Sequence, residues 1–191
     1  MALSLNNTVD AWGWPARLLH WAMAAVILFM LGLGIYMADF VTDTYAQFDL
    51  IQIHKSWGFV AFVLALIRVV WRATHKPAPA LPQTPHLQHL AAEGAHLALY
   101  VLMFLMPLSG WLMASASPLQ DSYGIKNMVF GLFAMPDPFQ PGSSALEGVF
   151  STIHGLGGWA MIAILAIHAA AALYHHFVVK DATLRRMTSG R

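Results

Sequence analysis

Three long stretches of the chain contain no Asp, Glu, Lys or Arg. They lie between Arg17 and Asp39, between Glu93 and Asp121, and between Glu147 and Lys180. A bilayer core about 30 Å thick is crossed by about 20 apolar residues in an α-helix. Even the shortest of the three, 18–38, reaches this length, so we expect a spanning helix in each stretch.

A fourth crossing is expected over residues 51–71. This segment contains Lys55 and Arg68 but is apolar over 57–67, and a crossing is needed here to join the first and second uncharged stretches. The sequence thus predicts an all-α integral membrane four-helix bundle, formed by one domain over residues 1–191. The expected helices cover about 15–38, 52–73, 90–115 and 151–179.

The composition excludes several other classes of protein. Apolar residues make up 58% of the chain and charged residues only 10%, whereas a soluble domain carries about 25% charged residues. The formal net charge is +1, so the basic footprint of a nucleic-acid-binding protein is missing. Because there is no Cys, the chain has no disulfide, Cys zinc site, iron–sulfur cluster or covalently attached haem.

The Lys and Arg residues predict the orientation, because cytoplasmic loops are enriched in them. Two of them, Lys55 and Lys126, fall on the side of the first and third loops. The other eight fall on the side of the termini: Arg17, Arg68, Arg72, Lys76, Lys180, Arg185, Arg186 and Arg191. We therefore expect both termini in the cytoplasm and the first and third loops, 39–53 and about 117–150, outside.

Histidines within the expected spans are the most informative polar residues, because ionisable side chains inside a membrane are functional candidates by default. His154 and His168 are 14 residues apart on one helix. At 100° and 1.5 Å per residue, they lie within about 40° of one face and roughly 21 Å apart along the axis. One face of this helix thus offers an imidazole near each membrane surface.

The topology supplies a partner for each of these imidazoles. His54 falls at the outer level with His154, and His20 falls at the inner level with His168. Two imidazoles from different helices are what six-coordinate haem iron requires, so we expect two haem b groups. Zinc fits less well because a catalytic site uses three protein ligands. The alternative is four packing histidines that hydrogen-bond to neighbouring helices.

Two further residues near the inner level are candidates for cofactor binding. His96 is expected to be a non-ligand; it would otherwise contact a haem edge or propionate, serve a quinone, or replace His20. Arg68 lies 14 residues after His54 and hence at the level of the inner haem. It would either pair with a haem propionate, a charge-assisted contact, or extend towards the lipid head groups.

Several motifs resemble those of a known family. They are Arg17-Leu-Leu-His20-Trp21, Ile53-His54-Lys55-Ser56-Trp57-Gly58, His96-Leu-Ala-Leu-Tyr100, His154, His168-Ala-Ala-Ala-Ala-Leu-Tyr-His175-His176 and Lys180-Asp-Ala-Thr-Leu-Arg-Arg-Met187. The chain resembles the bacterial cytochrome b561 family, most closely its dihaem superoxide oxidase type. The resemblance implies that His20, His54, His154 and His168 ligate two haems. It also implies a multi-pass protein of the bacterial inner membrane.

The resemblance further implies an oxidoreductase that oxidises periplasmic superoxide and reduces ubiquinone. Lys55, beside His54, would guide superoxide towards the outer haem. However, the outer side carries a net charge of −4, which repels an anion and suits a basic redox protein. Quinone-linked exchange with a periplasmic carrier such as a c-type cytochrome is therefore the second hypothesis.

A haem anchor subunit of a larger dehydrogenase or hydrogenase is a third hypothesis, and a small transporter a fourth. The absence of intramembrane Asp and Glu weighs against the transporter. Quinone would bind at either surface. We favour the inner one, near His20, Arg68 and His168, because carrying charge across the membrane would explain the presence of two haems.

Overall fold

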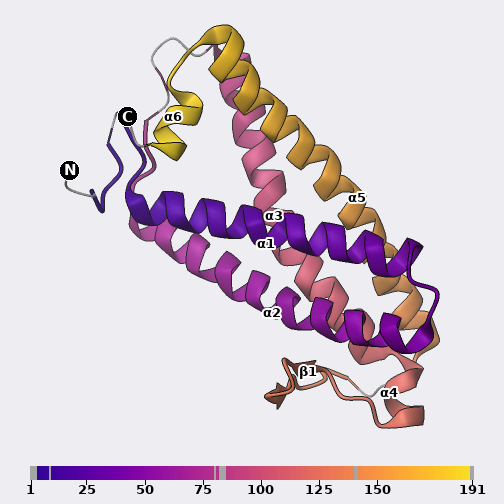
Figure 1. Ribbon diagram of the computed structural model, residues 1–191. Helices are drawn as coiled ribbons and strands as arrows, with labels where there is room; N and C mark the ends of the chain where they lie inside the picture. The colour runs from indigo at the N-terminus through magenta and orange to yellow at the C-terminus, as the bar shows by residue number, and fades with distance from the viewer. Residues whose placement is uncertain (1–3, 9, 80, 82–84, 140–141, 190–191) are drawn as a thin grey trace. The chain divides into compact units, whose positions relative to one another are not determined.

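The computed structural model describes residues 4–8, 10–79, 81, 85–139 and 142–189 (Figure 1). Arg191, counted above in the orientation argument, lies outside these residues. Four long α-helices dominate the described chain: α1 Trp14–Asp39, α2 Thr44–Thr74, α3 His86–Ala116 and α5 Ser144–Tyr174. Each contains a segment long and apolar enough to cross a membrane. Four helices of the predicted kind, including the one containing Lys55 and Arg68, are thereby confirmed.

The helices begin earlier than hydropathy predicted. The α2 helix starts at Thr44 rather than near residue 52, because the Asp43 carboxylate accepts a hydrogen bond from the Ala46 amide at 2.8 Å and caps the first turn. The α5 helix likewise starts at Ser144, where Ser143 Oγ accepts from the Leu146 amide. Hydropathy marks only the apolar part of a helix, so these polar first turns were missed.

Short elements connect the long helices. They are α4 Pro118–Tyr123, the strands β1 Met128–Val129 and β2 Phe133–Ala134, the π-helix η1 His175–Val179, and α6 Thr183–Thr188. The two strands pair antiparallel, with positive φ angles of 49° at Phe130 and 70° at Gly131 in the tight turn between them. This hairpin is a small departure from the all-α prediction.

The chain divides into two compact units. Unit 1 comprises Met1–Ala24, Leu64–Val101 and Met161–Arg191, and unit 2 comprises Ala25–Val63 and Leu102–Ala160. Each long helix contributes one segment to each unit. As a result, His20, Arg68, His96 and His168 fall in unit 1, whereas His54, Lys55 and His154 fall in unit 2.

In unit 1, the N-terminal segment runs beside α6 (Figure 1). The Trp12 amide donates to the Arg186 carbonyl at 3.2 Å, and the Trp21 indole N–H donates to the Met187 carbonyl at 3.0 Å. The Arg17 guanidinium donates to the Thr188 carbonyl at 2.9 Å. These bonds tie the start of α1 to the C-terminal helix.

The long helices carry large apolar side chains on their surfaces. On α5, for example, Leu156, Trp159 and Ile167 are 68%, 66% and 65% exposed. Soluble proteins rarely expose large contiguous apolar patches. The exposed side chains therefore form a surface suited to lipid.

Candidate functional site

In unit 1, the structure brings together one histidine from α1 and one from α5. The ring centres of His20 and His168 are 6.2 Å apart, and the ring planes are inclined by 49°. A metal–imidazole bond is about 2 Å long, so two imidazoles on opposite sides of one metal have ring centres roughly 6 Å apart. The separation in this couple, called here the His20 pair, therefore fits one metal ion between the rings.

In unit 2, a second couple comes from α2 and α5. The ring centres of His54 and His154 are 6.1 Å apart, and the ring planes are inclined by 79°. We call this couple the His54 pair. Its ring-centre separation also fits one metal ion between two imidazoles. His54 and His154 lie far apart in the chain and meet only in the folded protein.

The environment of His154 leaves one ring nitrogen free to bind a metal. His154 Nδ1 lies 3.0 Å from the Met106 carbonyl and 3.1 Å from Ser109 Oγ. Since a metal-bound imidazole donates its other N–H to a carbonyl or similar acceptor, Nδ1–H donates to Met106 and Nε2 is left for the metal. A Cβ built on Gly110 would lie only 3.0 Å from His154 Cε1, so this glycine lets the ring seat against α3.

His54 has a similar close approach but lacks a hydrogen-bond partner. A Cβ built on Gly34 would lie 3.4 Å from His54 Cε1. His54 Nδ1 is buried and finds no hydrogen-bond partner in the part of the chain that the structure describes. Buried polar atoms are nearly always paired, so His54 differs from His154: among the described residues no acceptor fixes its tautomer as the Met106 carbonyl does for His154.

Cationic and aromatic side chains surround the His20 pair. Arg68 donates from Nε to the Tyr100 hydroxyl at 3.2 Å, and its NH2 group lies 3.3 Å from His20 Nδ1. The Arg68 and Arg72 guanidinium carbons lie 5.5 Å and 5.9 Å from the centre of the Tyr100 ring. This arrangement is a positive cluster suited to an anionic group.

The contact between Arg68 and His20 constrains how His20 binds a metal. A guanidinium has donors only, so His20 Nδ1 accepts and the proton sits on Nε2. An imidazole that binds iron through Nε2 instead carries its proton on Nδ1 and cannot accept there. Ligation through His20 Nε2 therefore requires Arg68 to release the ring, which frees the guanidinium for another acceptor.

His96 also lies beside the His20 pair. Its ring centre is 5.4 Å from that of His168, with the planes inclined by 64°. The structure therefore places all four expected residues of unit 1 together: His20, Arg68, His96 and His168. Tyr100 joins them, although the sequence analysis gave it no role beyond its place in a motif.

Lys55 of unit 2 belongs to a polar network. Its ammonium donates to Asn127 Oδ1 at 3.2 Å, and Asn127 Nδ2 donates to Asp137 Oδ1 at 2.8 Å. Asn127 is only 5% exposed. Asn127 and Ser109 were not predicted from the sequence, since neither lies in a motif and both meet their partners only in the folded chain.

The described residues contain no group of three or more His, Cys, Asp or Glu side chains placed to hold a metal ion. The two couples therefore stand apart from ordinary three- and four-ligand protein metal sites. Each offers two imidazoles facing one another, with glycines or cations around them.

Comparisons with known proteins show which family the chain resembles. Residues 11–190 match the family described as prokaryotic cytochrome b561. The chain is 31% identical over 185 residues to cytochrome b561 homolog 2 of Escherichia coli (strain K12), covering 97% of this chain and 95% of the relative. It is 30% identical over 142 residues to cytochrome b561 homolog 1 of the same organism, covering 73% and 75% of the two chains.

A third relative is the probable superoxide oxidase CybB of Yersinia pestis. The identity is 28% over 170 residues, which cover 88% of this chain and 90% of the relative. The family match covers nearly the whole chain and contains both histidine pairs. The chain therefore belongs to the prokaryotic cytochrome b561 family.

Proposed function

We propose that this chain is a dihaem b protein, with one haem held by His20 and His168 and the other by His54 and His154. The observation that carries the proposal is the pair of ring-centre separations, 6.2 Å and 6.1 Å. Membership of the cytochrome b561 family makes the chain a transmembrane electron-transfer protein with b-type haem. Each haem supplies a site that gains or loses one electron.

The side chains around each pair have distinct roles in this proposal. The Met106 carbonyl holds His154 in the tautomer that ligates through Nε2. Arg68, which contacts His20 in the structure, would hold a haem propionate by a charge-assisted bond. His96 packs beside His168 as a non-ligand. With two imidazoles holding each haem, neither site would bind a reactant at the metal, and both would carry electrons only.

For the reactants, we propose superoxide and ubiquinone. Two superoxide anions each lose one electron and become oxygen. One ubiquinone takes up those two electrons with two protons and becomes ubiquinol. Two observations support this reaction: a relative bears the name probable superoxide oxidase, and Lys55 follows His54 directly. In this proposal the termini face the cytoplasm of a bacterium, and the His54 pair faces the periplasm across its inner membrane.

A second candidate function is electron exchange between quinone and a basic periplasmic redox protein such as a c-type cytochrome. The network of Lys55 favours it, because Asp137 binds the same Asn127 and offsets the ammonium charge. A surface with balanced or negative charge attracts a basic protein better than a small anion.

Stopped-flow reduction of the purified oxidised protein separates the two candidates. Superoxide should reduce both haems rapidly, the rate should fall with rising salt, and added quinone should reoxidise them. Lys55→Met should slow reduction several-fold, whereas Lys126→Met on the same loop side serves as the matched control. Rapid reduction by ubiquinol but none by superoxide would favour exchange with a redox protein.

A further inference from the structure

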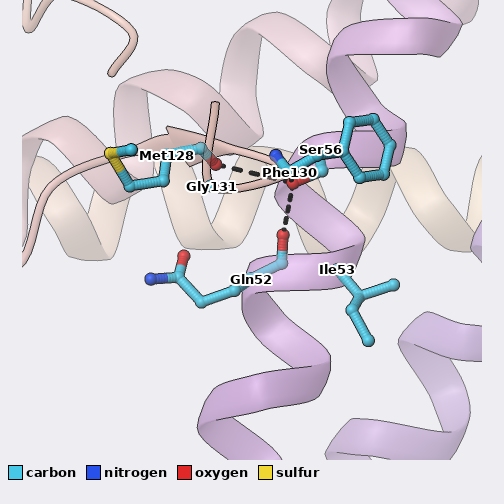
Figure 2. A pocket seen from close by; sticks show the side chains of 6 residues that line it. All are labelled: Gln52, Ile53, Ser56, Met128, Phe130 and Gly131. Atoms are coloured by element: carbon cyan, nitrogen blue, oxygen red, sulfur yellow. Dashed lines mark hydrogen bonds between the residues drawn. The ribbon is translucent and has the colours of Figure 1, made fainter. Parts of the chain in front are cut away.

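An open cavity of about 320 Å³ lies between α2 and the β1–β2 hairpin in unit 2, and two of its lining residues, Ile53 and Phe130, are 43% and 49% exposed. Figure 2 shows its lining residues, which are Gln52, Ile53, Ser56, Met128, Phe130 and Gly131. The volume is at the lower end of the range of small-molecule sites, about 300–1,000 Å³. Neither histidine pair lines it, so it is a separate feature of unit 2.

The hairpin wall of the cavity is anchored to α2 through one serine. Ser56 Oγ accepts a hydrogen bond from the Phe130 amide at 2.9 Å and donates to the Gln52 carbonyl at 2.8 Å (Figure 2). The Phe130 ring also packs edge-on against Trp57, with centres 5.9 Å apart. These contacts hold the turn in place, so the cavity is pre-formed.

Gln52 supplies the free polar group of the cavity. Its Oε1 is buried and has no hydrogen-bond partner among the described residues, whereas the Ser56 hydroxyl is satisfied. An amide offers both an acceptor and two donors. A buried unpaired acceptor is costly, so a ligand that brings a donor to Gln52 would stabilise the site.

The rest of the lining restricts the class of ligand. Ile53, Met128 and Phe130 present apolar surface, and α2 is one of the membrane-spanning helices. A ligand that enters from lipid, fits apolar walls and meets one amide is a flat ring bearing carbonyl or hydroxyl groups. We propose that this cavity binds the head group of a quinone, with Gln52 as its hydrogen-bond partner.

The chemistry of Gln52 suits both redox forms of the head group. The amide NH2 donates to a carbonyl of the quinone, and Oε1 accepts from a hydroxyl of the quinol. Conversion of the bound quinone to quinol consumes two electrons and two protons. This inference rests on the proposed function, because the two electrons come from the two proposed haem sites, each of which gives one.

The position on α2 connects the cavity to the His54 pair. Gln52 precedes His54 by two residues, so the two lie at nearly the same level but about 200° apart around the helix. Trp57 lies one turn after His54 and contacts Phe130 of the cavity wall. The cavity therefore lies in unit 2, with the His54 pair. From the sequence we had favoured the inner surface, near the His20 pair, for quinone, because charge transfer across the membrane would explain two haems.

Photolabelling tests the assignment directly. The haem-loaded protein in phospholipid vesicles is illuminated with azido-ubiquinone, with and without excess decylubiquinone, and the labelled peptides are mapped by mass spectrometry. Labelling that decylubiquinone displaces should map to residues 52–57 and 128–133. Labels confined to unit 1, for example around Arg68 and His96, or the absence of displaceable labelling, would overturn the assignment.

Two matched pairs of variants sharpen the test. Ile53→Trp fills the cavity and should reduce labelling at least tenfold, whereas Ile51→Trp, which lies outside the lining, should not. Gln52→Leu should weaken decylubiquinone competition about tenfold, whereas Gln88→Leu on the exposed surface of α3 should leave it unchanged. Unchanged labelling in both cavity variants contradicts the proposal.

The haem spectrum of every variant is recorded alongside the labelling. If Ile53→Trp keeps wild-type haem content and loses labelling, the cavity is the quinone site. If wild-type protein shows two haems and electron transfer but labels elsewhere, the cavity assignment fails and the proposed function stands. Absence of the two-haem spectrum from wild-type protein is instead a failure of the proposed function itself.

Discussion

The ring nitrogens of the two histidine pairs face different surroundings. His154 Nδ1 meets a neutral backbone carbonyl, whereas His20 Nδ1 meets the guanidinium of Arg68. A nearby cation disfavours the more positive oxidised state of a metal site. If the chain holds two haems as proposed, the one at the His20 pair should therefore have a potential raised by Arg68, and the two should titrate separately.

Replacing Arg68 tests this difference. Arg68→Gln removes the cation and should lower the midpoint potential of one haem by tens of millivolts, where about 59 mV corresponds to a tenfold change in a one-electron equilibrium. Spectroscopic redox titration measures the shift. Arg68→Lys keeps the charge and should retain most of the potential. An Arg68→Gln protein with unchanged potential and haem content would rule out contact between Arg68 and a propionate.

Gly110 offers a second test at the residue scale. An alanine there places a methyl group 3.0 Å from His154 Cε1, so the imidazole or α3 must shift, at a cost of about 1–3 kcal/mol for overpacking. Gly110→Ala should lower the occupancy of one haem towards one per chain, as measured by the pyridine haemochromogen assay. Gly94→Ala, on the same helix but with open space around its Cβ, should keep wild-type haem content.

Among the elements, the C-terminal turn from η1 to α6 depends on one carboxylate. Asp181 Oδ1 accepts from the Thr183 amide at 2.8 Å, and Oδ2 accepts from His175 Nδ1 at 2.5 Å. Lys180 adopts a left-handed conformation with φ 59°, which reverses the chain between the two helices. Asp181 thereby joins the end of η1 to the start of α6.

The pH dependence of this turn follows from Asp181. Burial raises the pKa of Asp181, but the hydrogen bonds from Thr183 and His175 lower it below its ordinary value overall. A lowered pKa means that the stabilisation is present above the ordinary value and lost as pH falls through the lowered one. Hydrogen exchange of the amides at 183–188 should therefore gain protection as pH rises through this acidic range, once corrected for intrinsic rates.

A variant separates this effect from general acid unfolding. Asp181→Asn should show fast exchange in α6 at neutral pH and little further loss of protection in acid. Asp10→Asn, which changes an exposed carboxylate of the N-terminal segment, should behave like the wild type. Protection of α6 in Asp181→Asn that matches the wild type at neutral pH, or that falls in acid as steeply as in the wild type, would contradict this role of Asp181.

The elements differ in how well the sequence predicted them. The four spans follow from long uncharged stretches, because burial of charge in lipid dominates every local preference. The β1–β2 hairpin has very short strands, which carry no periodic pattern. Its place depends on a hydrogen bond to Ser56 of α2, a residue so distant in the chain that no local signal reveals the contact.

For the whole molecule, the helical spacing of the histidines was enough to predict which side chains meet. An antiparallel order of four spans puts only certain helix ends at the same level, so His20 could meet His168 and His54 could meet His154. The network of Lys55, Asn127 and Asp137 was not predictable, because it depends on how the loop after α3 folds back. The cavity at Gln52 is hidden for the same reason.

The orientation in the membrane is a further property of the whole chain. Because the chain has no Cys, single cysteines report accessibility without background. Ser189→Cys, near the C-terminus, should react with a membrane-impermeant maleimide only in permeabilised cells, whereas Thr42→Cys, between α1 and α2, should react in intact cells. The reverse pattern would exchange the two faces while leaving the histidine pairs intact.

The central claim is that four imidazoles from three helices hold two haems in one chain. The direct measurement is haem b per polypeptide, by pyridine haemochromogen and amino-acid analysis, in wild-type protein and in His20→Ala and His54→Ala. The account predicts two haems for the wild type and one for each variant, with different redox potentials remaining in the two variants. One haem or none in the wild type, or the same remaining haem in both variants, would contradict it.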